Sequence, residues 1–279
     1  MIQWYPGHME KAKKDILKNL NLVDIVFELL DARLPLSSKN PMVDDILKNK
    51  PRLLLITKSS MADEKQNAAF LEYFRKQNQQ VMFIDSFKSL AINKIAATAR
   101  KILEPKLEKE KSKGMKERAI RVMILGIPNV GKSTFINQLV SKRATNVGNK
   151  PGVTKSQQWI RLHAGMELLD TPGVLWPKFE DESVAMHLAI SGAIKDQLLP
   201  LDEVVLYFLS FMQTYYPNNL VYRYRVIPSS TPLELLDQIG KNMNMLKNKE
   251  VDYDRVMHAI LQDFRSLRLG RITLDRIAT

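Results

Sequence analysis

Eight residues, from Gly126 to Ser133, have the types and the spacing needed to hold a triphosphate. They read GIPNVGKS and fit the phosphate-loop pattern G-x-x-x-x-G-K-S. In such a loop backbone N–H groups at a helix start wrap the phosphates, and only glycine lets the chain approach closely. Lys132 is predicted to reach the β- and γ-phosphates, and the Ser133 hydroxyl to bind Mg²⁺. The residues expected to contact the nucleotide here are Asn129, Val130, Gly131, Lys132, Ser133 and Thr134.

A second motif, DTPG at 170–173, follows the apolar run at 166–169. An aspartate at a strand end, here Asp170, can hold Mg²⁺ through water, while the N–H of Gly173 meets the γ-phosphate. Between the two motifs lies PGVT, whose Thr154 is a candidate hydroxyl ligand for the same ion. Three elements in this order predict a phosphate-binding NTPase.

The elements around the phosphate loop suit this chemistry, because a buried strand precedes it and a helix follows it. Further buried strands are predicted at 23–31, 52–56 and 81–86, all upstream of the loop. After Gly173 the patterns are helical, with no buried strand that leads into a base-recognition loop. The simplest sheet therefore takes its missing strands from upstream, which gives a circularly permuted, doubly wound α/β domain.

This order divides the chain into two predicted domains. Residues 1–178 form the permuted nucleotide domain, with base-recognition loops first, the phosphate loop second and a charged connector at about 104–118. Residues 179–279 form an all-helical domain, with helices predicted at about 181–194, 202–215, 231–246 and 252–268. Because Gly173 ends the nucleotide domain, the γ-phosphate sensor leads directly into the helical domain.

The segment Thr57-Lys58-Ser59-Ser60 occupies the base-recognition position, whose usual form is Asn-Lys-x-Asp. The aliphatic stem of Lys58 is expected to pack over the purine, with Ser86 as the backbone contact from the next loop. Ser60 stands where an aspartate normally accepts two hydrogen bonds from guanine, and charged hydrogen bonds are worth about 1.5 to 3 kcal/mol each. Asp63 could take that role only if the loop were rebuilt. The sequence therefore leaves the choice between guanine and adenine open.

Composition narrows the class of protein further. A formal charge of +12 attracts polyanions, and RNA or a ribosomal surface is the expected partner. The chain has no cysteine, which rules out disulfides and thiolate metal sites. The start of the sequence lacks a signal-peptide apolar region, and the longest apolar runs are too short to span a bilayer. We expect a soluble, cytoplasmic protein with no membrane partner.

Five motifs make the chain similar, over essentially its full length, to the circularly permuted GTPases of the bacterial ribosome biogenesis GTPase A group. They are WYPGHM at 4–9, DAR at 31–33, the phosphate loop, PGVT at 151–154 and DTPG at 170–173. The resemblance implies an enzyme that binds GTP and GDP with Mg²⁺ and assists late assembly of the large ribosomal subunit. It also implies that the helical C-terminal domain binds ribosomal RNA.

The residue after Gly173 is Val174, where Ras-like enzymes have a glutamine that orients water. Hydrolysis by the protein alone is therefore expected to be slow, since a supplied catalytic element can add about 10³ to 10⁵ in rate. The resemblance implies two substitutes, a potassium ion bound by Asn129 and a water-orienting histidine at His8. His8 equally suits a helix-entry residue that is held by backbone groups.

Three hypotheses remain open from the sequence. The leading one is a ribosome-activated GTPase that acts as an assembly switch. A second is a nucleotide-gated RNA scaffold with incidental hydrolysis, which the missing glutamine allows. A third is an ATPase, which Thr57 and Ser60 permit. Turnover with and without ribosomal subunits, and competition between ATP and GTP, separate the three.

Overall fold

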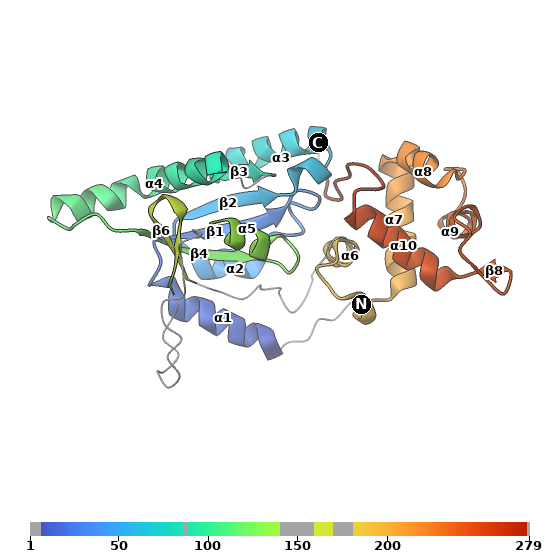
Figure 1. Ribbon diagram of the computed structural model, residues 1–279, viewed down its shortest axis with the longest axis horizontal. Helices are drawn as coiled ribbons and strands as arrows, with labels where there is room; N and C mark the ends of the chain where they lie inside the picture. The colour runs from blue at the N-terminus through green and yellow to red at the C-terminus, as the bar shows by residue number, and fades with distance from the viewer. Residues whose placement is uncertain (1–6, 86–88, 140–158, 170–180, 278–279) are drawn as a thin grey trace.

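The computed structural model describes residues 7–85, 89–139, 159–169 and 181–277, and shows a six-stranded sheet followed by a set of helices (Figure 1). The strand order is β3-β2-β1-β4-β6-β5, with all neighbours parallel except β5 and β6. The strands are β1 (Ile25–Asp31), β2 (Arg52–Thr57), β3 (Val81–Ile84), β4 (Ile120–Gly126), β5 (Trp159–Leu162) and β6 (Met166–Leu169).

The central strand is β1, which the chain supplies first. Its seven residues, IVFELLD, are all buried, as expected for a parallel strand covered on both faces. Phe27 lies in register with Leu53 of β2 on one side and with Ile124 of β4 on the other. Upstream strands therefore complete the sheet that carries the phosphate loop. This confirms the predicted circularly permuted, doubly wound α/β fold.

Helices cover both faces of the sheet. One face packs on α4 (Ser89–Ser112) and α5 (Lys132–Leu139), through Ile95 and Phe135 among others. The opposite face packs on α1, α2 and α3, which supply buried residues to two further apolar clusters. These three helices are α1 (Gly7–Leu20), α2 (Pro41–Leu47) and α3 (Glu64–Lys76).

The charged segment at 104–118 is mostly helical rather than a loose connector, because α4 continues to Ser112. Lysine and glutamate are good helix formers. Lys106 and Glu110 also pair at i,i+4, and both Lys106 and Arg118 bond to the carboxylate of Asp24 at the start of the sheet. The link from α4 to β4 is thus confined to residues 113–119.

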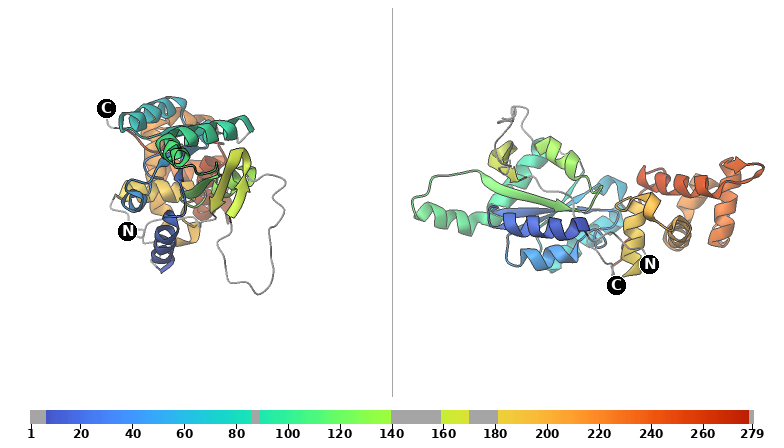
Figure 2. Two further views of the ribbon diagram at one scale, coloured as in Figure 1. Left: turned by 90° about the vertical axis from the view of Figure 1, so that its left-hand side faces the viewer. Right: turned by 90° about the horizontal axis from the view of Figure 1, so that it is seen from below.

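The helices after the sheet extend from one of its ends, beyond α6 (Figures 1 and 2). They are α6 (Glu182–Ser191), α7 (Leu201–Tyr215), α8 (Pro217–Tyr224), α9 (Pro232–Asn242) and α10 (Tyr253–Arg265), with a short hairpin of β7 (Leu246–Lys247) and β8 (Glu250–Val251). The sequence pattern missed α8, because the proline after two tyrosines resembles a turn. Pro217 is instead the first helical residue, where its missing N–H costs nothing.

Helix α6 belongs to both hydrophobic cores. Leu188 packs into the core of the sheet, whereas Ala189 and Ile190 pack into the core of the helical part. The predicted boundary between residues 178 and 179 lies outside the described residues.

The chain after α10 returns to the sheet. The N–H of Leu274 donates to the carbonyl oxygen of Arg33 at 2.6 Å, and Asp275 accepts the N–H groups of Leu36 and Ser37 at 2.6 and 2.8 Å. The segment 272–277 thus ties the end of the helical part to the loop after β1. Within the described ranges, no helix is both long and apolar enough to cross a bilayer.

Candidate nucleotide site

The site lies at the edge of the sheet where β1, β2, β3 and β4 end. Parallel strands bring their carboxyl ends to one edge, and β1 has β2 on one side and β4 on the other. Ligands of open α/β sheets bind at such a switch in strand order. The loops after these strands therefore meet at the place where the fold favours a ligand, on the side that faces α6 (Figure 1).

The phosphate loop connects β4 directly to the first turn of α5, which begins at Lys132. Gly126 packs against β1, where an added Cβ would lie 3.1 Å from the carbonyl oxygen of Leu29. Gly131 has a φ of +100°, a left-handed conformation that favours glycine. Both glycines of the motif are thus required by the local geometry, and Ser133 is exposed at the helix N-terminus.

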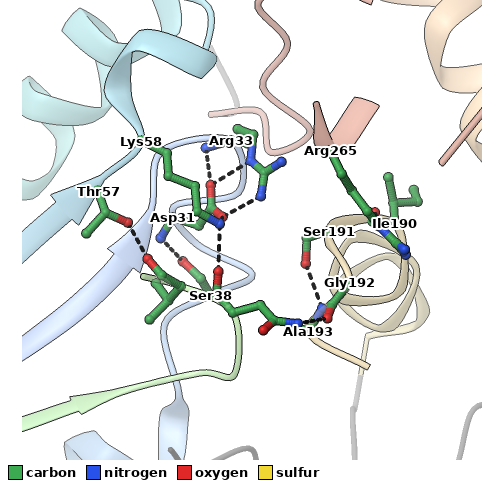
Figure 3. A network of polar contacts seen from close by, with 12 residues as sticks. Asp31, Arg33, Ser38, Thr57, Lys58, Ile190, Ser191, Gly192, Ala193 and Arg265 are labelled. Carbon is green, nitrogen blue, oxygen red and sulfur yellow. Dashed lines mark hydrogen bonds and ion pairs between the residues drawn. The ribbon is translucent and has the colours of Figure 1, made fainter. Parts of the chain in front are cut away.

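The loop 57–60, which follows β2, contacts the phosphate loop, which follows β4 on the other side of β1 (Figure 3). The hydroxyl of Thr57 donates to the carbonyl oxygen of Val130 at 2.7 Å, and Lys58 Nζ donates to that of Asn129 at 2.7 Å. These two contacts join residues more than seventy positions apart in the sequence. Thr57 therefore fixes the phosphate loop with its hydroxyl, a role that does not require the usual asparagine.

Asp31, at the end of β1, holds Lys58 in place. Its Oδ2 accepts from Lys58 Nζ at 2.8 Å and from Arg33 Nη2 at 2.7 Å, while Oδ1 accepts from Arg33 Nε at 3.0 Å (Figure 3). Burial acts to raise the pKa of Asp31, but the adjacent Arg33 and Lys58 charges outweigh it and lower that pKa. Burial lowers the pKa of Lys58, and Asp31 opposes this. The carboxylate is thus ionised and orients the lysine.

Arg33 connects Asp31 to the helical part. Its guanidinium lies over the ring of Phe264 in α10, 4.9 Å from the ring centroid. In the sequence, DAR at 31–33 indicates a family pattern but no particular role for these residues. A buried arginine two residues after a buried aspartate is the signal of an ion pair at a strand end.

The phosphate loop also touches α6 directly. Asn129 Nδ2 donates to the carbonyl oxygen of Gly192, the C-terminal cap of α6, at 2.6 Å. Arg265 of α10 braces the same helix end, donating to the carbonyl oxygens of Ala189 and Ile190 and pairing with Asp196. An open cavity of about 810 Å³ lies here, lined by Arg33, Lys58, Asn129, Ser191, Gly192, Ile194, Lys195, Asp196, Gln197, His258 and Arg265.

His187 of α6 is buried in a polar network. Its Nδ1 lies 2.9 Å from both Ser37 Oγ and Asp275 Oδ1, and its Nε2 lies 2.9 Å from Tyr207 Oη. The network connects α6, α7, the loop after β1 and the returning segment 272–277.

Several predicted site residues cannot be placed in this geometry. Ser86, Thr154, Asp170 and Gly173 lie outside the described residues, as does the side chain of His8, whose backbone belongs to α1. The structure brings together Thr57, Lys58, Asn129, Val130 and the start of α5.

Comparison with known proteins agrees with this arrangement. A family described as "50S ribosome-binding GTPase" matches residues 121–214. Ribosome biogenesis GTPase A of Bacillus pumilus is 45% identical over 278 residues, covering 99% of this chain and 98% of that protein. The protein of the same name from Thermotoga maritima is 32% identical over 276 residues, covering 99% and 94%. The solved GNP-bound YlqF from T. maritima is 26% identical, with a TM-score of 0.68, covering 95% of this chain and 98% of that one.

The permuted sheet, the phosphate loop and the loop 57–60 that contacts it are those of a circularly permuted phosphate-loop GTPase. Such an enzyme binds GTP and GDP with Mg²⁺, and an exposed serine hydroxyl at the start of α5 fits as one ligand of that ion. Full-length identity of 45% shows that the chain belongs to the ribosome biogenesis GTPase A family. It is a GTP-hydrolysing enzyme of that family.

Proposed function

We propose that this protein is a GTP-dependent assembly factor of the large ribosomal subunit that binds ribosomal RNA through its helical part. The observation that carries the proposal is the 45% identity over 278 residues to a protein named Ribosome biogenesis GTPase A. The matching family is described as ribosome-binding, and the net charge of +12 favours a polyanionic partner. We divide the chain at residues 178 and 179 into a nucleotide domain and an RNA-binding domain.

The proposed chemistry is phosphoryl transfer to water, in which positioning and charge stabilisation do most of the work. Lys132 contacts the β- and γ-phosphates, and the N–H of Gly173 senses the γ-phosphate. Ser133, Thr154 and Asp170 would hold the Mg²⁺ ion, Asp170 through water, and the ion would neutralise charge on the phosphates. His8 orients the attacking water.

Asn129 is proposed to bind a potassium ion that adds positive charge near the phosphates. Its side chain already donates from Nδ2 to Gly192, so its Oδ1 is the atom suited to a cation. The same residue would then report occupancy of the nucleotide site to the C-terminal end of α6. This contact supports a switch in which the triphosphate state fixes the helical part and hydrolysis releases it.

The surface that suits RNA on the helical part lies on and after α8. Tyr222 has 88% of its surface exposed, and Arg225 is exposed on the same helix end. An exposed aromatic ring beside an arginine can stack a base and contact a phosphate. Arg265 and Arg276 are less suited, since Arg265 pairs with Asp196 and Arg276 lies over Tyr215.

The test compares GTP turnover with and without purified large subunits, in potassium and in sodium. We expect slow turnover alone, and a rise with large subunits in potassium that is absent with small subunits. Binding to large-subunit particles should require a non-hydrolysable GTP analogue and be lost with GDP. Equal binding in both nucleotide states would contradict the switch, and RNA binding without stimulated turnover would favour a scaffold.

A further inference from the structure

The base-recognition loop lacks its usual carboxylate at Ser60, but a carboxylate reaches that position from the next strand. Asp85 directly follows β3, and its Oδ1 accepts the backbone N–H of Ser60 at 2.7 Å. The register explains the contact, because Ile84 at the end of β3 pairs with Thr57 at the end of β2. The residue after Ile84 is thereby brought beside the loop 57–60.

The other nearby carboxylates have different partners. Asp63 Oδ1 caps α3 by accepting the N–H of Lys65 at 2.9 Å, and its Oδ2 accepts the hydroxyl of Tyr216 at 3.0 Å. Asp31 is buried and bonded to Arg33 and Lys58. Of the three, Asp85 alone is exposed and, within the described part of the chain, has an oxygen, Oδ2, with no hydrogen-bond partner.

We propose that Asp85 supplies the carboxylate that reads guanine, in place of an aspartate at position 60. A carboxylate oxygen has two lone pairs, so Oδ1 can hold Ser60 while the group accepts from a base. Guanine presents two N–H donors on its Watson–Crick edge, N1–H and the 2-amino group. Adenine presents an acceptor at N1 and no 2-amino group, so the same carboxylate repels it.

This inference rests on the proposed function, a GTPase, and on the assignment of residues 57–60 as the base-recognition loop. It differs from that assignment because it moves the specificity from the loop itself to the neighbouring strand. The hydrogen bond between Asp85 and Ser60 also fixes the backbone of the loop 57–60. The carboxylate of Asp85 and the side chain of Lys58 are therefore held in one arrangement. Guanine selectivity is then compatible with the sequence TKSS.

The test is competition of unlabelled GTP, XTP and ATP against a fluorescent guanine nucleotide on the full chain. In Asp85→Asn the side chain can still accept from Ser60 but offers an amide donor to the base. We expect its GTP affinity to fall by about 10- to 100-fold, the range set by charged hydrogen bonds. XTP, which has a carbonyl in place of the 2-amino group, should gain affinity, and ATP binding should be unchanged or stronger.

Two further variants make the result decisive. Ser60→Asp in the Asp85→Asn background restores a carboxylate at the usual position and should recover the preference for GTP over XTP. Asp63→Asn, which keeps the cap of α3, should leave the preference unchanged.

Thermal melting and ATP binding report whether each variant is folded. A GTP-to-ATP ratio in Asp85→Asn within about twofold of wild type would overturn the proposal, as would a wild type without guanine preference. Loss of binding to all nucleotides in Lys132→Ala tests the phosphate site separately, so failure of the nucleotide assignment is distinguishable from failure of the Asp85 assignment.

Discussion

Asp31 shows how one buried side chain connects folding to the nucleotide site. It is 2% exposed and pairs with both Arg33 and Lys58, two cations that would otherwise be desolvated together with no negative charge beside them. Removing one partner of a buried ion pair costs about 3 to 5 kcal/mol, because the remaining charge is left uncompensated. We expect Asp31→Asn to lose that much stability in chemical denaturation and to bind nucleotide more weakly, since Lys58 loses its anchor.

The same residue makes stability depend on pH. Because the pKa of Asp31 is lower in the folded chain than in the unfolded chain, its contribution is fully present above about pH 4 and is lost as pH falls below that value toward the folded pKa. The stability difference between wild type and Asp31→Asn should therefore be smaller at about pH 3 than at about pH 6, with the loss confined to below about pH 4 and at most 1.4 kcal/mol per pH unit. A difference that stays constant with pH would contradict this.

Two substitutions of Thr57 test its hydrogen bond to the phosphate loop. Thr57→Val keeps the shape but removes the donor to Val130, which costs about 0.5 to 1.5 kcal/mol and loosens the loop. Thr57→Ser keeps the hydroxyl. We expect faster nucleotide dissociation in the valine variant than in the serine variant, measured by stopped-flow fluorescence. Equal rates would show that the hydroxyl is dispensable.

At the scale of elements, the returning segment 272–277 connects the helical part to the loop after β1 by hydrogen bonds. Asp275 accepts from Ser37 and from the N–H groups of Leu36 and Ser37, and it also contacts His187. Asp275→Ala leaves the N–H groups of Leu36 and Ser37 without this acceptor, and each such group, where buried, costs about 1 to 3 kcal/mol. We expect a large drop in melting temperature and early proteolysis near residue 270.

A second Asp–His pair provides the control for that prediction. Asp254 and His258 lie on α10 with 82% and 49% of their side chains exposed. Exposed ion pairs contribute about 0 to 1 kcal/mol. Asp254→Ala should therefore melt close to wild type, and a loss as large as that of Asp275→Ala would indicate a general effect of removing acid groups.

The elements differ in how far the sequence could predict them. The strands at 25–31, 52–57, 81–84, 120–126 and 166–169 are short and rich in apolar residues, and their order along the chain indicated the permutation. Helix α8 was missed because its start resembles a turn, and the return of 272–277 could not be predicted because Asp275 and Ser37 are 238 residues apart. The motif at 126–133 predicted the phosphate loop. The position of Asp85 beside Ser60 could not be predicted in the same way, because it depends on the register between β2 and β3.

At the scale of the whole molecule, the basic charge predicts a salt-dependent partner. If α8 contacts RNA, Arg225→Ala should reduce the slope of log affinity against log salt by about 0.7 to 0.9. Tyr222→Ala should weaken binding by about 1 to 3 kcal/mol with the slope unchanged, because stacking is not ionic. Filter binding to ribosomal RNA over a salt series measures both.

Tyr253→Ala on α10 serves as the control for stacking, since Tyr253 is 44% exposed against 88% for Tyr222. Equal effects of the two tyrosine variants would contradict a base contact at Tyr222. An unchanged salt slope in Arg225→Ala would place the phosphate contacts elsewhere on the molecule.

The position of β1 in the middle of the sheet has a consequence for biosynthesis. β1 and β2 leave the exit tunnel early, but β4, whose Met123 lies beside Val26, is translated nearly a hundred residues later. During that interval one edge of an apolar strand has no neighbour, and such an edge can recruit foreign strands. A nascent chain stalled before residue 120 should therefore depend on chaperones, and one stalled after β4 has emerged should not.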